Sequence, residues 1–223
     1  AIDPSGYPIV AWDDDASGQH QIYIKRFDGQ RWAEVGVGSA SGGGISGSAQ
    51  GASGPSLATD NGGVPVVAWV NGTDQASEIY VKRFAGDTWQ DLGVGSASGG
   101  GISDNAAESN APSVAVDSGG QPVVVWDDKA GGDLNVYVRR LVGATWQEVG
   151  TSSATGGGIS NSTRGAYAPS LVVGASGGPI VAWEAWEDVN AGLPKVYIRR
   201  LDGDAWVEVG VGSASGVGVS PTV

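Results

Sequence analysis

A repeat of about 57 residues runs through the whole chain and constrains its fold more than any other feature. Four tryptophans, Trp12, Trp69, Trp126 and Trp183, are each 57 residues apart. Further aromatic residues recur with steps of 57, 57 and 60 residues: Tyr23, Tyr80, Tyr137, Tyr197, Trp32, Trp89, Trp146 and Trp206. The repeats cover approximately residues 1–54, 55–111, 112–168 and 169–223, and the fourth carries a three-residue insertion. We therefore predict a single domain over residues 1–223, built from four copies of one unit.

Each repeat is expected to form four short antiparallel strands. In the second repeat the expected strands are 55–60, 65–69, 79–84 and about 89–92. β-branched and aromatic residues favour extended chain, and no segment shows the 3.6-residue period of an amphipathic helix. A small sheet cannot bury both faces alone, whereas blade packed on blade around an axis buries them. The pattern predicts an all-β fold, a β-propeller of four blades, with an open solenoid as the alternative.

The twelve repeated Trp and Tyr residues are assigned to packing between blades, because large aromatic side chains dominate buried interfaces. The start of the chain, 1–3, aligns with 58–60 near the end of a first strand. We expect Val223 to lie beside Ala1, so that the C-terminus completes the first blade and closes the ring without a free edge. Two alternatives remain: 220–223 continues a loop, as 160–163 does, or two chains form one eight-bladed ring.

Composition excludes several classes of function. The chain has 24 Asp and Glu against 12 Lys and Arg, a net charge of −12, so binding to nucleic acid is not expected. It has no cysteine, which excludes disulfides, thiolate metal sites and a cysteine nucleophile. There is no long apolar run, and we predict no membrane insertion.

Acidic residues are concentrated in the segments expected to link the second and third strands. These segments, 13–21, 70–78, 127–135 and 184–195, hold 11 of the 24 acids and should lie on one face. A solvated rim is one explanation, and recognition of a cation or a polyhydroxylated ligand is the other. Function should concentrate where the repeat is broken, as at Tyr167, Arg164 and the longer last loop. The candidate ligand-binding residues are Trp186, Glu184, Glu187, Asp188, Asp127 and Asp128.

One acidic loop has the spacing of a calcium ligand set. Asp13, Asp15 and Ser17 match the Asp-x-Asp-x-Ser-Gly start of a calcium-binding loop, but Ile24 stands where the bidentate Glu of that motif is needed. A plain acidic turn is the alternative. Calcium is thus a candidate ion, and no cofactor is required.

No catalytic set is evident. The third strands collect eight of the twelve bases, which repeat around the ring and are expected to pair with Glu34, Asp91, Glu148 and Glu208. The single histidine, His20, lies in a polar loop, where a bystander role is expected. We therefore predict that the chain has no catalytic residues and is not an enzyme.

Recurring phrases give the sequence a family resemblance. Pro-Val-Val-Ala-Trp at 65–69, Ile-Tyr-Val-Lys-Arg-Phe at 79–84 and Gly-Ser-Ala-Ser-Gly-Gly-Gly-Ile-Ser at 95–103 resemble repeat units of secreted bacterial β-propeller proteins. The units are loosely similar to sialidase-type Asp-box blades, although the segment 28–32 is one residue shorter than that box. The resemblance implies a location outside the cell or on its surface.

These observations lead to a predicted function and two alternatives. The prediction is a non-enzymatic extracellular binding or adhesion module with a glycan or another extracellular ligand as its partner. The first alternative is a self-assembling or surface-layer scaffold, with homo-oligomers. The more distant alternative is a sialidase-like glycoside hydrolase.

Overall fold

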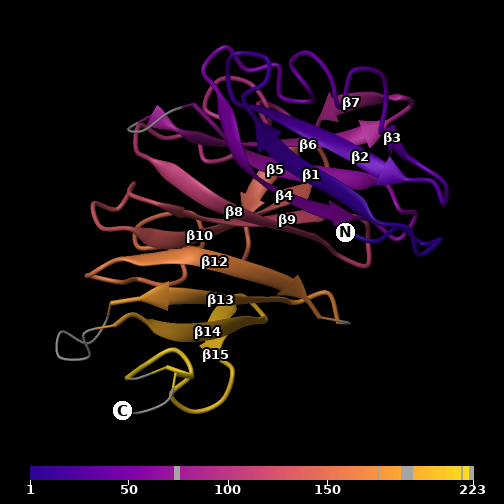
Figure 1. Ribbon diagram of the computed structural model, residues 1–223. Coiled ribbons are helices and arrows are strands. Elements are labelled where there is room, and N and C mark those ends of the chain that lie inside the picture. The colour runs from indigo at the N-terminus through magenta and orange to yellow at the C-terminus, as the bar shows by residue number, and fades with distance from the viewer. Residues whose placement is uncertain (73–75, 175, 187–192, 217, 221–223) are drawn as a thin grey trace.

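The computed structural model describes residues 1–72, 76–174, 176–186, 193–216 and 218–220, which form four antiparallel sheets and no helix (Figure 1). We call these sheets blades 1 to 4. Blade 1 contains β1 (Ile9–Asp14), β2 (Gln21–Phe27) and β3 (Trp32–Glu34). Blade 2 contains β4 (Ala52–Thr59), β5 (Pro65–Asn71), β6 (Glu78–Ala85) and β7 (Thr88–Asp91). Blade 3 contains β8 (Ser109–Val116), β9 (Pro122–Asp128), β10 (Asn135–Val142) and β11 (Thr145–Glu148). Blade 4 contains β12 (Ala166–Val173), β13 (Pro179–Ala185), β14 (Lys195–Asp202) and β15 (Ala205–Glu208).

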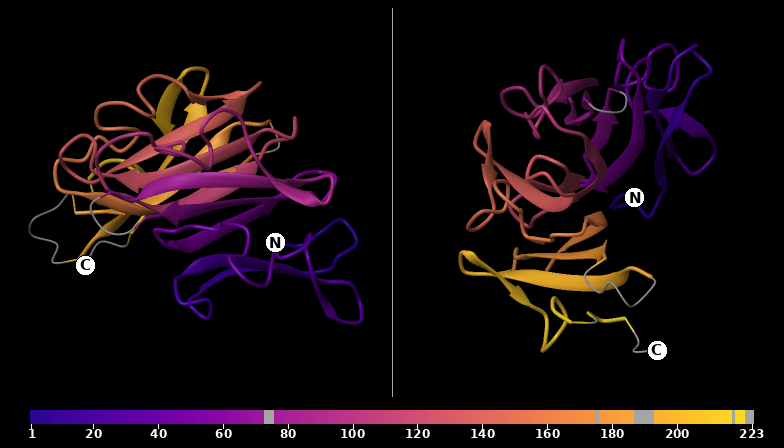
Figure 2. Two further views of the ribbon diagram at one scale, coloured as in Figure 1. Left: turned by 90° about the horizontal axis from the view of Figure 1, so that it is seen from above. Right: turned by 90° about the vertical axis from the view of Figure 1, so that its left-hand side faces the viewer.

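The blades are arranged as in a propeller. Within each blade the strands pair in chain order, and the innermost named strands of successive blades pack together, β1 on β4, β4 on β8 and β8 on β12. One edge of every sheet is thereby brought toward a common centre. The sheets follow one another around a curve, from the indigo first blade to the yellow end of the fourth (Figure 2). The predicted all-β, four-bladed propeller is confirmed. Among the described residues no helix is long and apolar enough to cross a membrane.

Among the described residues, blade 1 has three strands where the others have four. Of these residues, 1–3 are the ones that lie beside β1 in the place of an innermost strand. The amino group of Ala1 donates to the Ile9 carbonyl at 3.0 Å, the Ile9 amide donates to the Ala1 carbonyl at 2.9 Å, and Ile2 forms a β-bridge with Pro8. Residues 1–3 therefore correspond to the end of a first strand, in agreement with the alignment.

Ser220, the last residue that the structure describes, lies in a loop. Its Oγ accepts a hydrogen bond from the Val196 amide at 2.8 Å. The same bond recurs in the other blades, from Ile22 to Ser46, from Ile79 to Ser103 and from Val136 to Ser160. This position supports the alternative in which the chain continues a loop at this point. The predicted pairing of Val223 with Ala1 lies outside the described residues.

The core consists of three apolar clusters, one at each junction between blades. Trp69, Trp126 and Trp183 are 0%, 2% and 3% exposed and pack toward the preceding blade. Each tryptophan stands opposite a tyrosine of the next strand, as Trp69 does with Tyr80 at 6.0 Å between ring centroids. Trp12 has no described blade before it and is only partly buried.

The outer parts of the three junctions repeat two hydrogen bonds. The first joins an outer-strand indole to a carbonyl of the preceding blade: Trp89 to Val35 at 2.8 Å, Trp146 to Leu92 at 2.7 Å and Trp206 to Val149 at 2.7 Å. The second joins a third-strand cation to another carbonyl: Lys82 to Ile45 at 3.0 Å, Arg139 to Ile102 at 2.6 Å and Arg199 to Ile159 at 2.5 Å. Every junction thus uses the same polar contacts.

In blades 1 to 3 the other base of the third strand pairs differently from the sequence expectation, and in blade 4 Arg200 pairs with Asp202 of its own strand. Ion pairs join Arg26 to Asp3, Arg83 to Asp60 and Arg140 to Asp117, at the turn that leads into the second strand. Glu34, expected as a partner, instead accepts hydrogen bonds from the Gly38 and Ala40 amides of its own loop, although Lys25 stands opposite it. Adjacent strand residues point to opposite faces, so each pair of bases serves two separate roles.

The Gly-rich loops need glycine because their backbone packs closely against the third strand of the same blade. Gly158 has φ +59°, and a Cβ there would lie 2.1 Å from the Val136 carbonyl oxygen. This close approach lets the Ile159 amide donate to Val136 at 2.8 Å and places the Ile159 side chain in the core, 2% exposed. Only glycine combines a left-handed conformation with this lack of space. The repeated glycines are therefore structural and not linker sequence.

Candidate functional site

Two sets of loops meet at one end of the sheets, which we call the loop end. The first set links the pairs β1–β2, β5–β6, β9–β10 and β13–β14, and the second is the Gly-rich set. The Tyr23 hydroxyl donates to the Gly42 carbonyl at 2.8 Å, which joins the two sets in blade 1. The Ala52 amide donates to the His20 carbonyl at 2.9 Å, and so ties the same end to blade 2. The acidic segments thus gather at the loop end, as the sequence predicts.

Blade 3 carries a group of four polar side chains at this end. Asn110 stands opposite Asp127 in the β8–β9 ladder, and the Lys129 amide donates to the Glu108 carbonyl just beyond it. Since alternate residues of a strand share a face, Glu108, Asn110, Asp127 and Lys129 lie on one side of the sheet. We call them the blade 3 cluster. Asp127 points toward blade 4, where its Oδ2 accepts from the Ala168 amide at 2.9 Å.

The two carboxylates of this cluster have opposite electrostatic environments. Burial raises the pKa of Asp127 to about 6, and the nearby carboxylates of Asp128 and Glu108 add to this effect, against the hydrogen bond from Ala168. Hydrogen bonds from Lys129 and then Asn110 lower the pKa of Glu108. The Lys129 Nζ to Glu108 Oε2 distance is 2.5 Å, and the Asn110 Nδ2 to Glu108 Oε1 distance is 2.9 Å. Around pH 6, therefore, Asp127 is partly protonated while Glu108 is ionised.

The blade 3 cluster breaks the repeat. At the position of Glu108 the second and fourth blades have Gly51 and Gly165, and at the position of Lys129 they have Gly72 and Trp186. The backbone hydrogen bond between these positions is nevertheless kept, from Gly72 to Gly51 and from Trp186 to Gly165. Sequence reasoning missed Glu108 because it lies just before a first strand, outside the acidic segments. The available signal was a charged residue where the other repeats have glycine.

Asp128, predicted to bind a ligand, is 1% exposed, and its carboxylate oxygens accept hydrogen bonds from other groups of the protein. Its Oδ2 accepts from Ser109 Oγ at 2.6 Å, Asn105 Nδ2 at 2.8 Å and Trp126 Nε1 at 3.1 Å. Its Oδ1 accepts from the Ala130 amide at 2.6 Å. With four internal donors this carboxylate fixes the loop and the core tryptophan, and it is not available to a ligand.

A second group, in blade 4, contains two of the predicted ligand-binding residues. Tyr167 stands opposite Glu184 in the β12–β13 ladder, and its hydroxyl forms hydrogen bonds with the side chains of Glu184 and Trp186. Burial, and then the Glu184 carboxylate, raises the pKa of Tyr167. The Trp186 side chain is 41% exposed. Glu187 and Asp188 lie outside the described residues.

The residues predicted to bind calcium interact with different groups of the protein. Asp13 Oδ2 lies 3.2 Å from His20 Nδ1, and its Oδ1 accepts from the Gly54 amide of blade 2. Ser17 Oγ donates to the Gln19 carbonyl and accepts from the Tyr23 hydroxyl. Across the described part of the chain no three Asp, Glu or His side chains converge as metal ligands, Asp15 included. Calcium binding by this loop stays a prediction.

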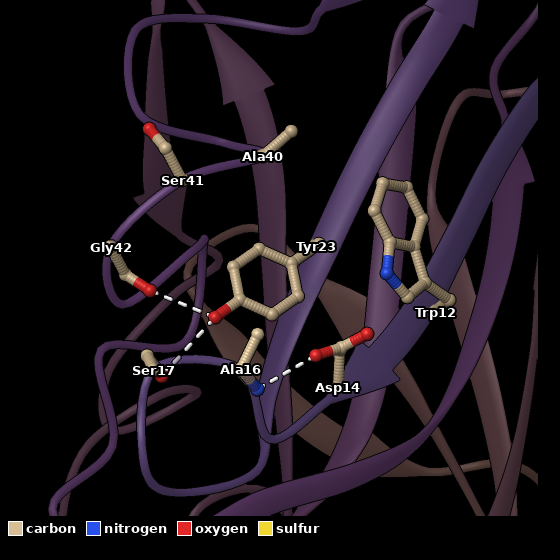
Figure 3. Close-up of a pocket in the computed structure, with 8 residues that line it drawn as sticks. All are labelled: Trp12, Asp14, Ala16, Ser17, Tyr23, Ala40, Ser41 and Gly42. Carbon is tan, nitrogen blue, oxygen red and sulfur yellow. Dashed lines mark hydrogen bonds between the residues drawn. The ribbon is translucent and has the colours of Figure 1, made fainter.

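A pocket of about 330 Å³ opens in blade 1. Trp12, Asp14, Ser17, Tyr23 and Gly42 are among the residues that line it (Figure 3). The Asp14 carboxylate accepts from the Ala16 amide at 2.7 Å, and the two aromatic rings are 5.9 Å apart. In blades 2 to 4 the corresponding tryptophans are buried against a preceding blade. The pocket therefore lies on an end face of the propeller, away from the blade 3 cluster.

The fold recurs in solved structures. A protein of unknown function from Dyadobacter fermentans aligns over 93% of this chain and 66% of its own, with TM-score 0.59 and 13% identity. An α-L-arabinanase from Penicillium chrysogenum, solved with arabinobiose, aligns over 96% and 66%, with TM-score 0.60 and 15% identity. A thermostable family-43 glycoside hydrolase aligns over 97% and 73%, with TM-score 0.50 and 13% identity. The chain spans just under two thirds of the first two proteins. No protein-family model and no curated protein matches the sequence.

The comparison corrects two predictions. Solved structures that share this propeller include glycoside hydrolases, which contradicts the prediction of a non-enzymatic binding or adhesion module and the prediction that the chain is not an enzyme. Both predictions rested on the lack of a sialidase-type set of converging arginines in the sequence.

Proposed function

We propose that this chain is a glycoside hydrolase and that Asp127 and Glu108 are its two working carboxylates. The observation that carries the proposal is the blade 3 cluster, an unrepeated pair of carboxyl groups whose surroundings move their pKa values in opposite directions. Most glycosidases use such a pair, one carboxyl as acid and the other as base or nucleophile. The fold, shared with known glycosidases, supports the same reaction class.

The chemistry assigns one role to each residue. Protonated Asp127 donates its proton to the glycosidic oxygen as the bond to the anomeric carbon breaks. A water molecule adds to that carbon, and ionised Glu108 accepts the proton that the water releases. Lys129 and Asn110 hold the Glu108 carboxylate in one orientation and keep it ionised. Glu108 then releases its proton to solvent and Asp127 regains one from solvent, which completes the cycle.

The substrate class follows from the neighbouring groups. Trp186 offers an exposed aromatic face beside Tyr167 and Glu184, and such a face stacks on a sugar ring while the polar groups bind its hydroxyls. A neutral oligosaccharide fits better than an anionic one, because the loop end is acidic. We keep the extracellular or cell-surface location that the family resemblance implies, since polymeric glycans are found there.

The test is hydrolysis of a panel of oligosaccharides by the purified chain. Arabino-oligosaccharides come first in the panel because one protein of this fold was solved with arabinobiose. Product release is followed by chromatography. We expect turnover of at least one neutral substrate and a loss of kcat of about 100-fold or more in Asp127→Asn, which is typical for removal of a general acid.

Asp13→Asn is the matched control. Asp13 occupies the position of Asp127 in blade 1 and makes the same bond to the next blade, from the Gly54 amide, but has no counterpart of Glu108 beside it. We expect its kcat to stay within about threefold of the unmodified chain. Failure of the whole panel, or full activity of Asp127→Asn, would show the proposal to be wrong.

A further inference from the structure

Within the part of the chain that the structure describes, no blade covers the outer face of blade 4 or the outer face of blade 1, and the two faces have complementary side chains. On blades 1 to 3 the face toward the following blade has five apolar positions, which in blade 1 are Ile9, Ile22, Ile24, Val35 and Ile45, all 7% exposed or less. In blade 4 the same positions are Ile180, Val196, Ile198, Val209 and Val219, none of which is buried. Val209 is 41% exposed and Val219 is 50% exposed. We call these five residues the blade 4 end face.

The opposite end, in blade 1, is aromatic. The corresponding residues of blades 2 to 4 pack against a preceding blade, whereas Trp32 is 46% exposed and Trp12 and Tyr23 line the open pocket of Figure 3. Phe27 and Trp32 lie 5.6 Å apart between ring centroids and continue this surface. We call Trp12, Phe27 and Trp32 the blade 1 end face; Trp12 and Phe27 are partly exposed, and Tyr23 beside them is buried. An apolar surface that remains accessible in this way marks a site of association.

Hydrogen-bonding groups at the two ends are also complementary. At each internal junction an indole donates to a carbonyl of the blade before it, and a third-strand cation donates to a second carbonyl. Among the described residues the Trp32 indole and the Lys25 ammonium have no such acceptor. At the other end the carbonyl groups of Val209 and Val219 occupy the acceptor positions, and no described side chain donates to them.

The room around one repeated glycine also differs between the internal junctions and the free end of blade 4. At each internal junction a glycine directly follows the residue whose carbonyl accepts the indole hydrogen bond, and the next blade packs against it. A Cβ on Gly150, for example, would be 2.7 Å from the Leu201 side chain. Gly36 and Gly93 are similarly covered. At Gly210, the same position in blade 4, a Cβ would meet no described atom within 4 Å, so the surface there is free to receive a blade.

We propose that the blade 4 end face of one chain binds the blade 1 end face of a second copy, head to tail, with the contacts of an internal junction. Trp32 of the second copy then donates to the Val209 carbonyl, and Lys25 of the second copy donates to the Val219 carbonyl. These groups belong to the middle and outer strands and to a loop, so the contact involves no residue of an innermost strand of blade 1. Such a heterologous interface closes into a ring when two copies satisfy both ends.

The test measures the mass of the chain in solution by sedimentation and light scattering over a wide concentration range. We expect twice the 22.4 kDa of one chain, or a larger mass that rises with concentration if the ring does not close. Trp32→Ala and Val219→Asp should each weaken association at least about tenfold, because each damages one end face. Val94→Asp is the control, since Val94 is an 83% exposed loop residue of blade 2, outside both end faces.

A mixture of Trp32→Ala and Val219→Asp distinguishes head-to-tail association from other modes of association. Each variant alone keeps one intact end face and cannot pair with itself, whereas the intact blade 4 end of Trp32→Ala can bind the intact blade 1 end of Val219→Asp. We expect the mixture to form dimers that neither variant forms alone. A monomer at every concentration, association unaffected by either variant, or a mixture that stays monomeric would each overturn the proposal. Circular dichroism verifies that both variants are folded.

Discussion

Replacement of Asp127 by Asn is expected to make the protein more stable at neutral pH while it removes hydrolysis. Asp127 is 4% exposed, and its pKa is raised to about 6 by burial and by neighbouring carboxylates. Its ionisation in the folded state is therefore unfavourable. Asn removes the charge and keeps an oxygen that accepts from the Ala168 amide. The gain in free energy of unfolding at pH 7.5 should approach about 3 kcal/mol.

The direction of this stability change follows from the way the free energy of unfolding depends on pH. Because the pKa in the folded state lies above that of the unfolded chain, the folded protein binds this proton more tightly, and stability falls as pH rises from about 4 through about 6. The advantage of Asp127→Asn should accordingly be near zero at pH 4 and complete above pH 6. Urea unfolding at both pH values measures it. Asp13→Asn, at the partly exposed equivalent position, should give no comparable gain, and an equal gain in both variants would contradict the assignment.

Replacement of Asp128 by Ala should have the opposite and larger effect on stability. The substitution leaves Trp126 Nε1, Ser109 Oγ, Asn105 Nδ2 and the Ala130 amide without their common acceptor. Unpaired buried donors are costly, and we expect a loss of roughly 4 kcal/mol, which corresponds to about 10 °C in Tm. Differential scanning calorimetry measures the change.

Asp14→Ala is the control for this substitution. Asp14 occupies the position of Asp128 in blade 1 but accepts from the Ala16 amide alone and lies at the mouth of an open pocket. Its loss should cost less than about 1 kcal/mol, because water replaces the protein acceptor. Equal losses at the two positions would mean that the buried network around Asp128 contributes little. A large difference would establish Asp128 as a structural residue.

The repeat made the fold predictable. Aromatic residues at a fixed step and β-branched runs between glycines determine four similar sheets, and a small sheet must pack both faces. The first strands begin slightly earlier than expected, at Ala52 in blade 2, because a β-bulge between Ser53 and Ser56 lets the chain continue pairing toward the loop end. Such a bulge has no clear signature in one sequence, since Gly54 also fits a turn.

The candidate site was only partly predictable. Asp127, Glu184 and Trp186 could be located because acidic loops cluster and because the last repeat is longer. The distinction between Asp127 and Asp128 could not be made from the sequence: adjacent strand residues point to opposite faces, and only the structure shows which one meets internal donors. Glu108 stands out as a candidate only when the repeats are aligned, because its equivalents are Gly51 and Gly165. Trp32 and Val209 have the same residue types as most of their counterparts at the internal junctions, and they differ in that no adjoining blade is found among the described residues.

The pH dependence of kcat/KM is the most direct test of the proposed active site. With the best substrate of the oligosaccharide panel, activity should fall as pH rises through about 6, when Asp127 loses its proton, and should also fall in acid below the usual range of a glutamate, when Glu108 gains one. The limb near pH 6 should be absent from the residual activity of Asp127→Asn. A profile that stays flat from pH 5 to 8, or a limb that persists in that variant, would contradict the assignment of Asp127 as the acid.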